Sequence, residues 1–343
     1  MPQAETMDRD LLAMLACPRD HAALQVEGGG LRCAHGHDYP VVDGIPVFLL
    51  AEHDQTIGVA AASLHAASTG DGAPLYLETL GLSDAERREI ARDWRAGAPV
   101  DAAISHLVGA TSGLAYKGLT GRLRDYPIPD LPLASGGGEW LLDVGCNWGR
   151  WSTAAARKGW RVAGIDPSLG ALLAARRAFS ATTPQAHFVC GDARHLPFKA
   201  GAFAAAFSYS VIQHFSQADA ERTLAEIGRV LRPNGVAKIQ MAHEGGLRAR
   251  YMQARADDRI FHVRYWPLAA LRTVFETHIG PAELTAEAFG GLGLLAENRR
   301  HLPLKARLLI ALSGALKALA RAIPSLLRIA DSVYVTAIKR ARA

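Results

Sequence analysis

The chain has 343 residues, of which 49% are hydrophobic and 21% are charged, and its formal net charge is +5. This composition excludes a disordered chain and predicts a globular protein with two domains, or one domain with additions. The positive charge is scattered, without a long block of Lys and Arg, so the sequence does not indicate nucleic-acid binding.

The sequence of residues 1–50 predicts a small, separate module. A short helix precedes Cys17, and a hairpin around the triple-glycine turn 28–30 ends at Cys33. The stretch 39–47 then reads Tyr-Pro-Val-Val-Asp-Gly-Ile-Pro-Val. This succession resembles the small zinc-ribbon-like family that includes the activator subunit of tRNA and protein methyltransferases. The resemblance implies a compact β module.

The same resemblance raises the question of a zinc ion in this module. Zinc-binding members of the family use two Cys-x-x-Cys pairs, and here the second cysteine of each pair is missing. The side chains that remain are Cys17, His21, Cys33 and His37, with Asp20 and His35 as alternatives. Two thiolates and two imidazoles can bind zinc tetrahedrally, and a closed site with four protein ligands is structural. The alternative is a ribbon that folds without metal and exposes its histidines.

The segment 51–130 is interpreted as a linker followed by helices. Residues 51–75 are rich in Ala, Ser, Gly, Thr and His with little apolar periodicity, which predicts a linker or a loosely held loop. The sequence Ser-Asp-Ala-Glu at 83–86 opens a capped helix that we expect to extend to Arg95. A second helix is predicted over 101–116.

A glycine turn after an apolar run is the strongest pattern in the chain. The run 140–144 predicts a buried parallel strand, and Gly145 and Gly149 follow it before a helix from 151 to 159. Glycines let the backbone approach a ligand closely, and a helix N-terminus offers free N–H groups. Asp143 precedes the first glycine, where its carboxylate would repel a pyrophosphate and attract a cationic ligand.

Further strands with a polar residue at the end follow in order. A strand over 161–165 ends in Asp166, which is placed to bind ribose hydroxyls. A strand over 186–190 is followed by Gly-Asp-Ala, and a fourth over 203–209 leads into Ser-Val-Ile-Gln-His. A helix, an Arg-Pro-Asn-Gly turn and a fifth strand over 236–241 complete the pattern.

In order and spacing these corners resemble class I S-adenosylmethionine-dependent methyltransferases, in particular the type 11 group. That family holds the amino acid end of the cofactor with Asp-x-Gly-x-Gly-x-Gly, and here Asn147 replaces the middle glycine, although Asn tolerates left-handed backbone. The resemblance implies an α/β, Rossmann-like seven-stranded sheet with helices on both faces over residues 131–343, and S-adenosylmethionine as cofactor. The residues it assigns to the cofactor are Asp143, Gly145, Cys146, Asn147, Gly149, Asp166, Pro167, Asp192, Ala193 and Ser210.

The resemblance also implies where an acceptor would bind. The family folds helices over the cofactor ahead of the first strand, where Tyr116 and Lys117 are lid candidates or ordinary surface residues. It places a substrate wall after the fifth strand, where side chains could bind a carboxylate, a phosphate or sugar hydroxyls, or form a solvated cationic face. The side chains there are Arg248, Arg250, Tyr251, Arg255, His262, Arg264 and Tyr265.

In-line methyl transfer needs mainly proximity and alignment, and an oxygen nucleophile benefits from a general base. His214 and His243 follow the fourth and fifth strands at the rim where such sheets bind ligands, as bases or as hydrogen-bonded rim histidines. The Asn-Pro-Pro-Tyr motif of amine methylation is absent, and Ser-Tyr-Ser stands at 208–210. We therefore expect O-methylation of a small-molecule, glycan or lipid-linked acceptor. The alternatives are a tRNA- or protein-modifying enzyme with a fused activator, and a non-catalytic cofactor-binding scaffold protein.

Two further strands are predicted over 283–288 and 332–338, with a helical insertion over 300–328 between them. Its helix, 303–323, is amphipathic and basic. One arc contains Leu308, Leu309, Leu312, Leu316, Leu319 and Ile323, and the opposite side contains Arg307, Lys317 and Arg321. The helix is interpreted as packed on the core, as a wall for an apolar substrate, or as a peripheral membrane contact.

The remaining signals concern the compartment. Residues 1–10 are polar and acidic, unlike a signal peptide, and no uncharged apolar run approaches the roughly 20 residues of a spanning helix. Two of the four cysteines, Cys146 and Cys190, end predicted core strands, which is typical of a reducing compartment rather than a disulfide framework. We therefore expect a cytoplasmic protein.

Overall fold

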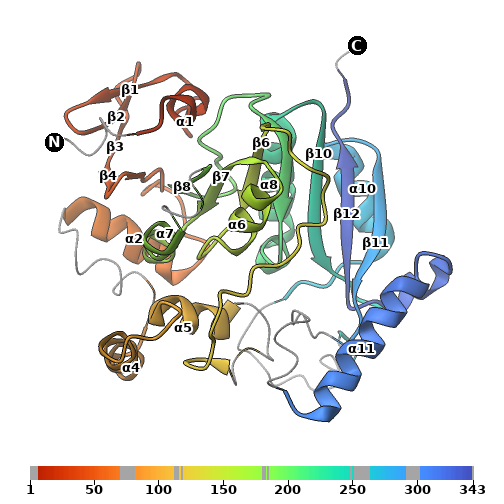
Figure 1. The fold of residues 1–343 in the computed structure, drawn as a ribbon. Coiled ribbons are helices and arrows are strands. Elements are labelled where there is room, and N and C mark those ends of the chain that lie inside the picture. The colour runs from red at the N-terminus through yellow and green to blue at the C-terminus, as the bar shows by residue number, and fades with distance from the viewer. Residues whose placement is uncertain are drawn as a thin grey trace.

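The computed structural model describes residues 7–69, 80, 82–111, 116, 119–179, 183, 185–247, 249–250, 263–290 and 302–341. Its centre is a seven-stranded sheet in the order β11-β12-β10-β9-β6-β7-β8 (Figure 1). The strands are β6 (Trp140–Val144), β7 (Arg161–Asp166), β8 (Ala186–Cys190), β9 (Phe203–Ser208), β10 (Leu231–Ala242), β11 (Ala282–Ala288) and β12 (Ser332–Ile338). The strands from β8 to β10 are parallel, and β12 runs antiparallel between β10 and β11. The predicted Rossmann-like sheet is confirmed.

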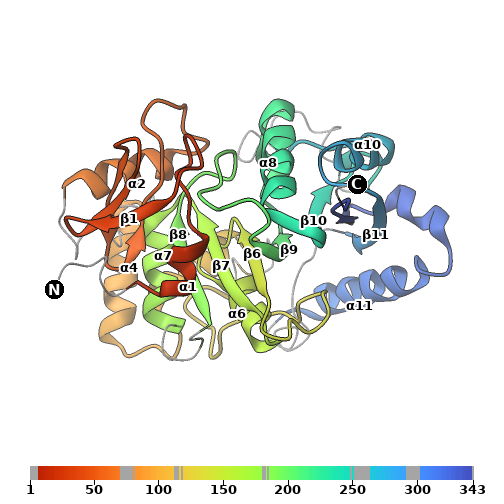
Figure 2. The ribbon, with the colours of Figure 1, turned by 90° about the horizontal axis from the view of Figure 1, so that it is seen from above.

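Helices cover both faces of the sheet (Figure 2). They include α6 (Arg150–Arg157), α7 (Leu169–Phe179), α8 (Gln217–Val230) and α10 (Leu268–His278). Successive residues of a strand point to opposite faces. Leu142 accordingly lies in one core cluster with the buried residues of α8 and α10, while Leu141 lies in another with Ala154 and Ala155 of α6.

The N-terminal module is joined to the edge of this sheet. It consists of α1 (Arg9–Met14), β1 (Leu24–Glu27), β2 (Gly30–Cys33), β3 (Asp38–Tyr39), β4 (Val41–Val42) and β5 (Ile45–Pro46). The hairpin predicted around the triple glycine is formed by β1 and β2. Val47 then pairs in parallel with Cys190, and Leu15 pairs with Phe198, so the module extends the sheet beyond β8.

The segment after this module is more ordered than the sequence indicated. Its described residues include the helices α2 (Gly58–Thr69), α4 (Asp84–Arg95) and α5 (Ala102–Thr111). The expected capping box of α4 is present, with Ser83 and Glu86 in reciprocal hydrogen bonds. The prediction of a linker or loop over 51–75 is wrong for the residues of α2. Ser63 Oγ in this helix accepts a 2.9 Å hydrogen bond from the amide of Leu169, and small Ala side chains let the helix approach α7 closely.

The C-terminal insertion forms α11 (Leu304–Leu319) and the 3₁₀ helix η5 (Pro324–Ile329). α11 contacts the body through a narrow line that includes Ile310, Leu316 and Ser313, whose Oγ accepts a hydrogen bond from the amide of Phe289. Most of its other leucines are exposed. Among the described residues, no helix has the length and apolar character needed to cross a membrane.

Candidate cofactor site and metal cluster

The turn after β6 has the backbone conformation that its glycines predict. Gly145, Asn147 and Gly149 have φ values of 74°, 46° and 79°, in the left-handed region. A Cβ at Gly145 would overlap the side chain of Val211. The amides of Gly145 and Cys146 donate to the carbonyl of Ile165 at 2.8 and 3.1 Å, which fixes the turn against the end of β7. The turn therefore places the main chain close to any ligand that binds between the end of β6 and the start of α6.

Two buried carboxylates meet at this turn. Asp143 accepts a 2.7 Å hydrogen bond from Ser152 Oγ, and Asp166 accepts the amides of Asn147 at 3.0 Å and Ser168 at 2.9 Å. Burial raises the pKa of Asp143 to about 7 and the pKa of Asp166 to about 6. No cation in the described parts of the chain lies within ion-pair distance of either carboxylate. A cationic ligand would therefore be stabilised here.

The corner fits the cofactor implied by the sequence resemblance. Asn147 Oδ1 is buried, and within the described structure it has no hydrogen-bond partner. An ammonium group would satisfy it, and the lone pairs of Asp166 not used by the two amides could accept ribose hydroxyls. A buried acceptor oxygen, two carboxylates with no cationic partner among the described residues and a glycine turn that allows close approach match an amino acid sulfonium linked to a nucleoside.

The third predicted acidic residue, Asp192, differs from Asp143 and Asp166 because an arginine pairs with it. Asp192 is buried, and Arg194 donates to its two oxygens from Nε and Nη2 at distances down to 2.6 Å. The same guanidinium reaches Asp219 at 3.1 Å and the carbonyl of Asp54 at 2.5 Å. Much of the hydrogen-bonding capacity of Asp192 is thus used within the protein. Its role, and that of Ala193, in adenine binding stays a prediction.

The other predicted cofactor residues surround the turn. Burial raises the pKa of the Cys146 thiol, which lies beneath the glycines, well above its ordinary value. Pro167 follows Asp166, and its carbonyl accepts from Cys190 Sγ at 3.7 Å. Ser210 has a left-handed φ of 60°, and its amide donates to Gln240 Oε1 at 2.8 Å.

The two histidines proposed as bases occupy different environments. His214 is exposed at the end of η3 (Ile212–His214), the 3₁₀ turn that follows β9 and contains Gln213. His243 is buried, and its Nδ1 donates a 3.0 Å hydrogen bond to the carbonyl of Ala330. It follows β10, two strands away from β6 in the sheet. The structure therefore leaves His214 accessible at the rim and holds His243 against the segment before β12.

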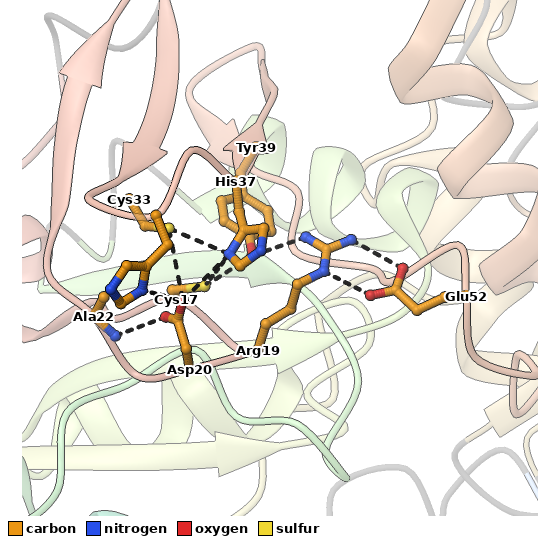
Figure 3. Close-up of polar contacts among 9 residues, drawn as sticks. Cys17, Arg19, Asp20, Ala22, Cys33, His37, Tyr39 and Glu52 are labelled. Atoms are coloured by element: carbon orange, nitrogen blue, oxygen red, sulfur yellow. Dashed lines mark hydrogen bonds and ion pairs between the residues drawn. The ribbon is translucent and has the colours of Figure 1, made fainter.

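A second polar cluster lies in the N-terminal module (Figure 3). The ligand atoms of Cys17, Asp20, Cys33 and His37 all lie within 4.8 Å of one another. His37 Nδ1 is 3.4 Å from Cys17 Sγ, 3.3 Å from Cys33 Sγ and 3.3 Å from Asp20 Oδ2. Zinc bond lengths of about 2.0 Å to N or O and 2.3 Å to S give tetrahedral edges of about 3.5 Å (S to N) and 3.3 Å (N to O). The donor set fits zinc.

The predicted ligand His21 lies outside this cluster. Its φ is 59°, and its Nε2 lies 4.0 Å from Glu226. The neighbouring Asp20, one of the two alternatives, takes its place, and the other alternative, His35, contacts the Asp20 carboxylate at 2.7 Å. The set is therefore two cysteines, one aspartate and one histidine.

Burial raises the pKa of the Cys17 thiol, and a hydrogen bond from Tyr39 opposes this shift (Figure 3). The Tyr39 hydroxyl lies 3.1 Å from Cys17 Sγ and accepts from Arg19 Nη1 at 3.0 Å. A guanidinium can only donate, so the phenol hydrogen is available to the sulfur. Glu52 fixes Arg19 through two bonds of 2.6 and 2.9 Å. Such a chain orients a metal ligand and stabilises its charge.

The sequence interpretation missed one buried cation near the glycine turn. Arg150, the first residue of α6, is only 7% exposed and stands among aromatic side chains. The signal was a charged residue at the start of a helix that otherwise buries small residues. Of the expected substrate wall, Arg250 is described and exposed. Lys117, Arg248, Tyr251, Arg255 and His262 lie outside the described residues.

Comparison with known proteins agrees with the resemblance for the central segment. Residues 141–235 match the family described as methyltransferase domain. An uncharacterized methyltransferase of Synechocystis is 30% identical over 132 residues, which are 38% of this chain and 60% of that protein. A bifunctional biotin biosynthesis protein of Cellvibrio japonicus is 36% identical over 108 residues, which are 31% of this chain and 20% of that protein. The chain thus spans less than two thirds of either relative.

Solved structures with a similar fold include two methyltransferase complexes. A phosphoethanolamine N-methyltransferase of Haemonchus contortus with S-adenosylmethionine is 19% identical, with a TM-score of 0.44 over 62% of this chain and 50% of that one. A complex of a methyltransferase activator with a methyltransferase from Haloferax volcanii is 19% identical, with a TM-score of 0.46 over 74% of this chain and 99% of the matched chain.

Proposed function

We propose that the chain binds S-adenosylmethionine and transfers its methyl group to an acceptor. One observation carries the proposal: the carboxylates of Asp143 and Asp166 are buried on either side of the left-handed Asn147 turn, and no cation among the described residues pairs with them. Burying carboxylates this way is unfavourable unless a ligand compensates them. The match of residues 141–235 to a methyltransferase domain supports the same conclusion.

The chain's own groups account for binding and orientation. Asp166 would accept the ribose hydroxyls, and Asp143 with Asn147 Oδ1 would bind the amino acid end. When bound, the cofactor supplies an electrophilic methyl group. Because this reaction needs no protein nucleophile, the fold contributes mainly alignment and the exclusion of water.

We infer an oxygen nucleophile on a small-molecule, glycan or lipid-linked acceptor, with His214 as the base. The imidazole of His214 lies at the exposed rim beyond β9, where an acceptor could reach it. With radiolabelled S-adenosylmethionine and hydroxyl acceptors, His214→Ala should lower kcat by about 10²–10⁴. His243→Ala is the comparison, and equal activity of wild type and His214→Ala would contradict this role.

We also propose that Cys17, Asp20, Cys33 and His37 hold a structural zinc ion. A closed four-ligand site leaves no position for a reacting water, so the ion would act on folding rather than on methyl transfer. The zinc-ribbon-like module would then be a stabilising part of this chain, fused to the methyltransferase domain at the edge strand.

A second candidate function concerns α11, which we propose as a peripheral contact with an anionic lipid surface. Leu304, Leu308 and Leu312 are 70%, 62% and 56% exposed. The described segment 302–330 carries five basic side chains and no acidic one. Exposed leucines on a basic helix are typical of interfacial helices. This exposure argues against a helix packed wholly on the core.

The decisive experiment is calorimetric titration of S-adenosylmethionine and S-adenosylhomocysteine into wild type, Asp166→Ala and Asp130→Ala. Asp130 is the matched control because its side chain is 85% exposed. We expect micromolar binding to wild type and to the control, and affinity about 10- to 100-fold weaker for Asp166→Ala, the usual loss for a hydrogen bond to a charged group. No binding to the wild type would refute the proposal.

A further inference from the structure

Arg150 is a buried cation that finds no counter-ion among the residues the structure describes. Its side chain is 7% exposed, and its Nε has no hydrogen-bond partner within the described structure. No carboxylate in the described ranges lies within ion-pair distance of it, although the chain forms such pairs at many other arginines. Burying an uncompensated guanidinium is strongly unfavourable. A buried Arg in this state is typical of a site that receives an anion.

Aromatic rings form the walls around this guanidinium. Its carbon lies 5.9 Å from the ring centre of Tyr116 and 5.6 Å from that of Trp151. Trp151 packs against Tyr209 at 5.0 Å, and Tyr209 lies 6.3 Å from Tyr334. These side chains come from the start of α6, the end of β9 and the first half of β12. Arg150 therefore faces the rim beside the cofactor corner, between walls that fix its plane.

The charges in this region favour an anion. Lys238 and Lys317 both lie over the Tyr334 ring, at 5.2 and 5.8 Å. The nearby carboxylate of Glu287 is already engaged, since it accepts hydrogen bonds from Tyr209 at 3.1 Å and from Ser332 at 2.6 Å. Glu283, which acts on Lys238, is a second carboxylate, so three cations (Arg150, Lys238 and Lys317) stand against two carboxylates in this region.

The charge of Arg150 affects the tyrosine side chains that lie near it. Burial raises the pKa of Tyr209 well above its ordinary value, Glu287 raises it further, and the charge of Arg150 opposes both. The pKa of Asp143 responds instead to burial, Ser152 and Asp166. The charge of Arg150 thus acts on the phenols of Tyr209 and Tyr334 that lie in this region.

We propose that Arg150 binds an anionic group of the acceptor, a carboxylate or a phosphate, next to the bound cofactor. The inference rests on the proposed function and specifies the acceptor class. A guanidinium fork binds such groups through two parallel N–H···O bonds, and the flanking rings prevent it from swinging to solvent. The carboxylate of the cofactor's own amino acid carries the same chemistry, so the test must separate these two sources.

The test uses the full chain and calorimetry. S-adenosylhomocysteine is titrated into wild type, Arg150→Met, Arg150→Lys and Arg157→Met. The last variant removes the same charge from the exposed end of α6. Inorganic phosphate and benzoate are then titrated into each protein after saturation with S-adenosylhomocysteine. Circular dichroism checks folding, and Arg150→Lys serves if Arg150→Met does not fold.

We expect S-adenosylhomocysteine to bind all variants within about threefold, and at least one anion to bind Arg150→Met about 10-fold or more weakly than wild type. Arg157→Met should behave as wild type, and Arg150→Lys should be intermediate. A tenfold loss of S-adenosylhomocysteine affinity in Arg150→Met would assign the guanidinium to the cofactor and overturn the proposal.

The proposal for Arg150 would also be overturned if the anions did not bind to wild type, or if they bound to Arg150→Met as well as to wild type. A wild type that does not bind S-adenosylhomocysteine refutes the proposed function instead, and titration of the anions into the free protein then still decides the role of Arg150.

Discussion

The amide of Phe48 donates a 2.7 Å hydrogen bond to the carbonyl of Cys190, the last residue of β8. This bond, with the pairing of Val47 beside it, attaches the N-terminal module to the sheet directly before the Asp192 corner. Parallel strands present their carboxyl ends at one edge, so the module borders the proposed adenine end of the cofactor site. Two motifs that are far apart in the sequence are therefore physically coupled.

The metal cluster should depend on Asp20 and not on His21. We expect Asp20→Ala and Cys33→Ser to lose bound zinc, because either change removes one of four ligands. His21→Ala should retain it, since His21 lies outside the cluster. Metal content of purified protein by mass spectrometry is the measurement. Loss of zinc in His21→Ala with retention in Asp20→Ala would show that the ligand set is wrong.

Zinc removal should also weaken cofactor binding through the junction at Cys190. We expect Cys33→Ser to lower the melting temperature and to bind S-adenosylhomocysteine several-fold more weakly than wild type, because the module supports the end of β8. Calorimetry compares Cys33→Ser with wild type and with His21→Ala, the control that keeps all four clustered side chains. Full cofactor affinity in a metal-free, destabilised protein would contradict the coupling.

Cofactor affinity should rise with pH between 6 and 8. The pKa values of about 7 for Asp143 and about 6 for Asp166 mean that burial holds these groups partly protonated near neutrality. A cationic ligand requires the ionised form, which for a pKa near 7 increases about tenfold over this range, so affinity should rise by about that factor. Titration in buffers of different ionisation enthalpy should detect released protons. Asp143→Asn should flatten the profile, and Asp130→Asn should not.

The raised pKa of Asp143 also predicts how the stability of the ligand-free protein changes with pH. A carboxyl whose folded pKa lies above its unfolded value stabilises the fold below the unfolded pKa and loses this contribution as pH rises through the folded pKa. For Asp143 this window runs from about 4 to about 7 and amounts to about 4 kcal/mol at 1.4 kcal/mol per unit. Urea unfolding should show ligand-free wild type less stable at pH 8 than at pH 5, and the loss should be smaller in Asp143→Asn, which keeps only the contribution of Asp166.

Gly145→Ala should abolish cofactor binding more completely than its backbone angle alone explains. The left-handed φ of 74° costs an alanine about 1–2 kcal/mol, and its Cβ would in addition overlap Val211. Gly28→Ala is the matched control, because its φ is 60° but nothing lies within 4 Å of the added carbon. Thermal unfolding and calorimetry of both variants separate the two effects. Equal destabilisation would mean that the contact with Val211 is unimportant.

The exposed face of α11 should bind anionic vesicles. We expect the double variant Leu308→Ser with Leu312→Ser to reduce co-sedimentation with phosphatidylserine vesicles several-fold while leaving the melting temperature nearly unchanged, because both side chains are exposed. Val26→Ser and Ile57→Ser, exposed apolar positions elsewhere, are the controls. Wild type that stays in the supernatant with both anionic and neutral vesicles would refute the membrane contact.

Local sequence patterns predicted the strands and their succession along the chain. The strands at 140–144, 186–190 and 332–338 have the predicted bounds, because buried strands are short apolar runs that end at turn residues. Asp143 and Asp166 could be placed at the same edge for the same reason, since parallel strands share the direction of their carboxyl ends. The spacing of Cys17 and Cys33 likewise indicated a metal cluster.

Tertiary structure decided the features that depend on what surrounds a residue. α2 gave no amphipathic signal, because small residues such as Ser63 pack by close approach rather than by apolar area. Asp20 rather than His21 lies with Cys17, Cys33 and His37 in the cluster, and the partner that Asp192 finds in Arg194 arises from the fold of its corner. That Arg150 is buried with no counter-ion in the described part of the chain is a property of its neighbours in space, which local sequence periodicity does not encode.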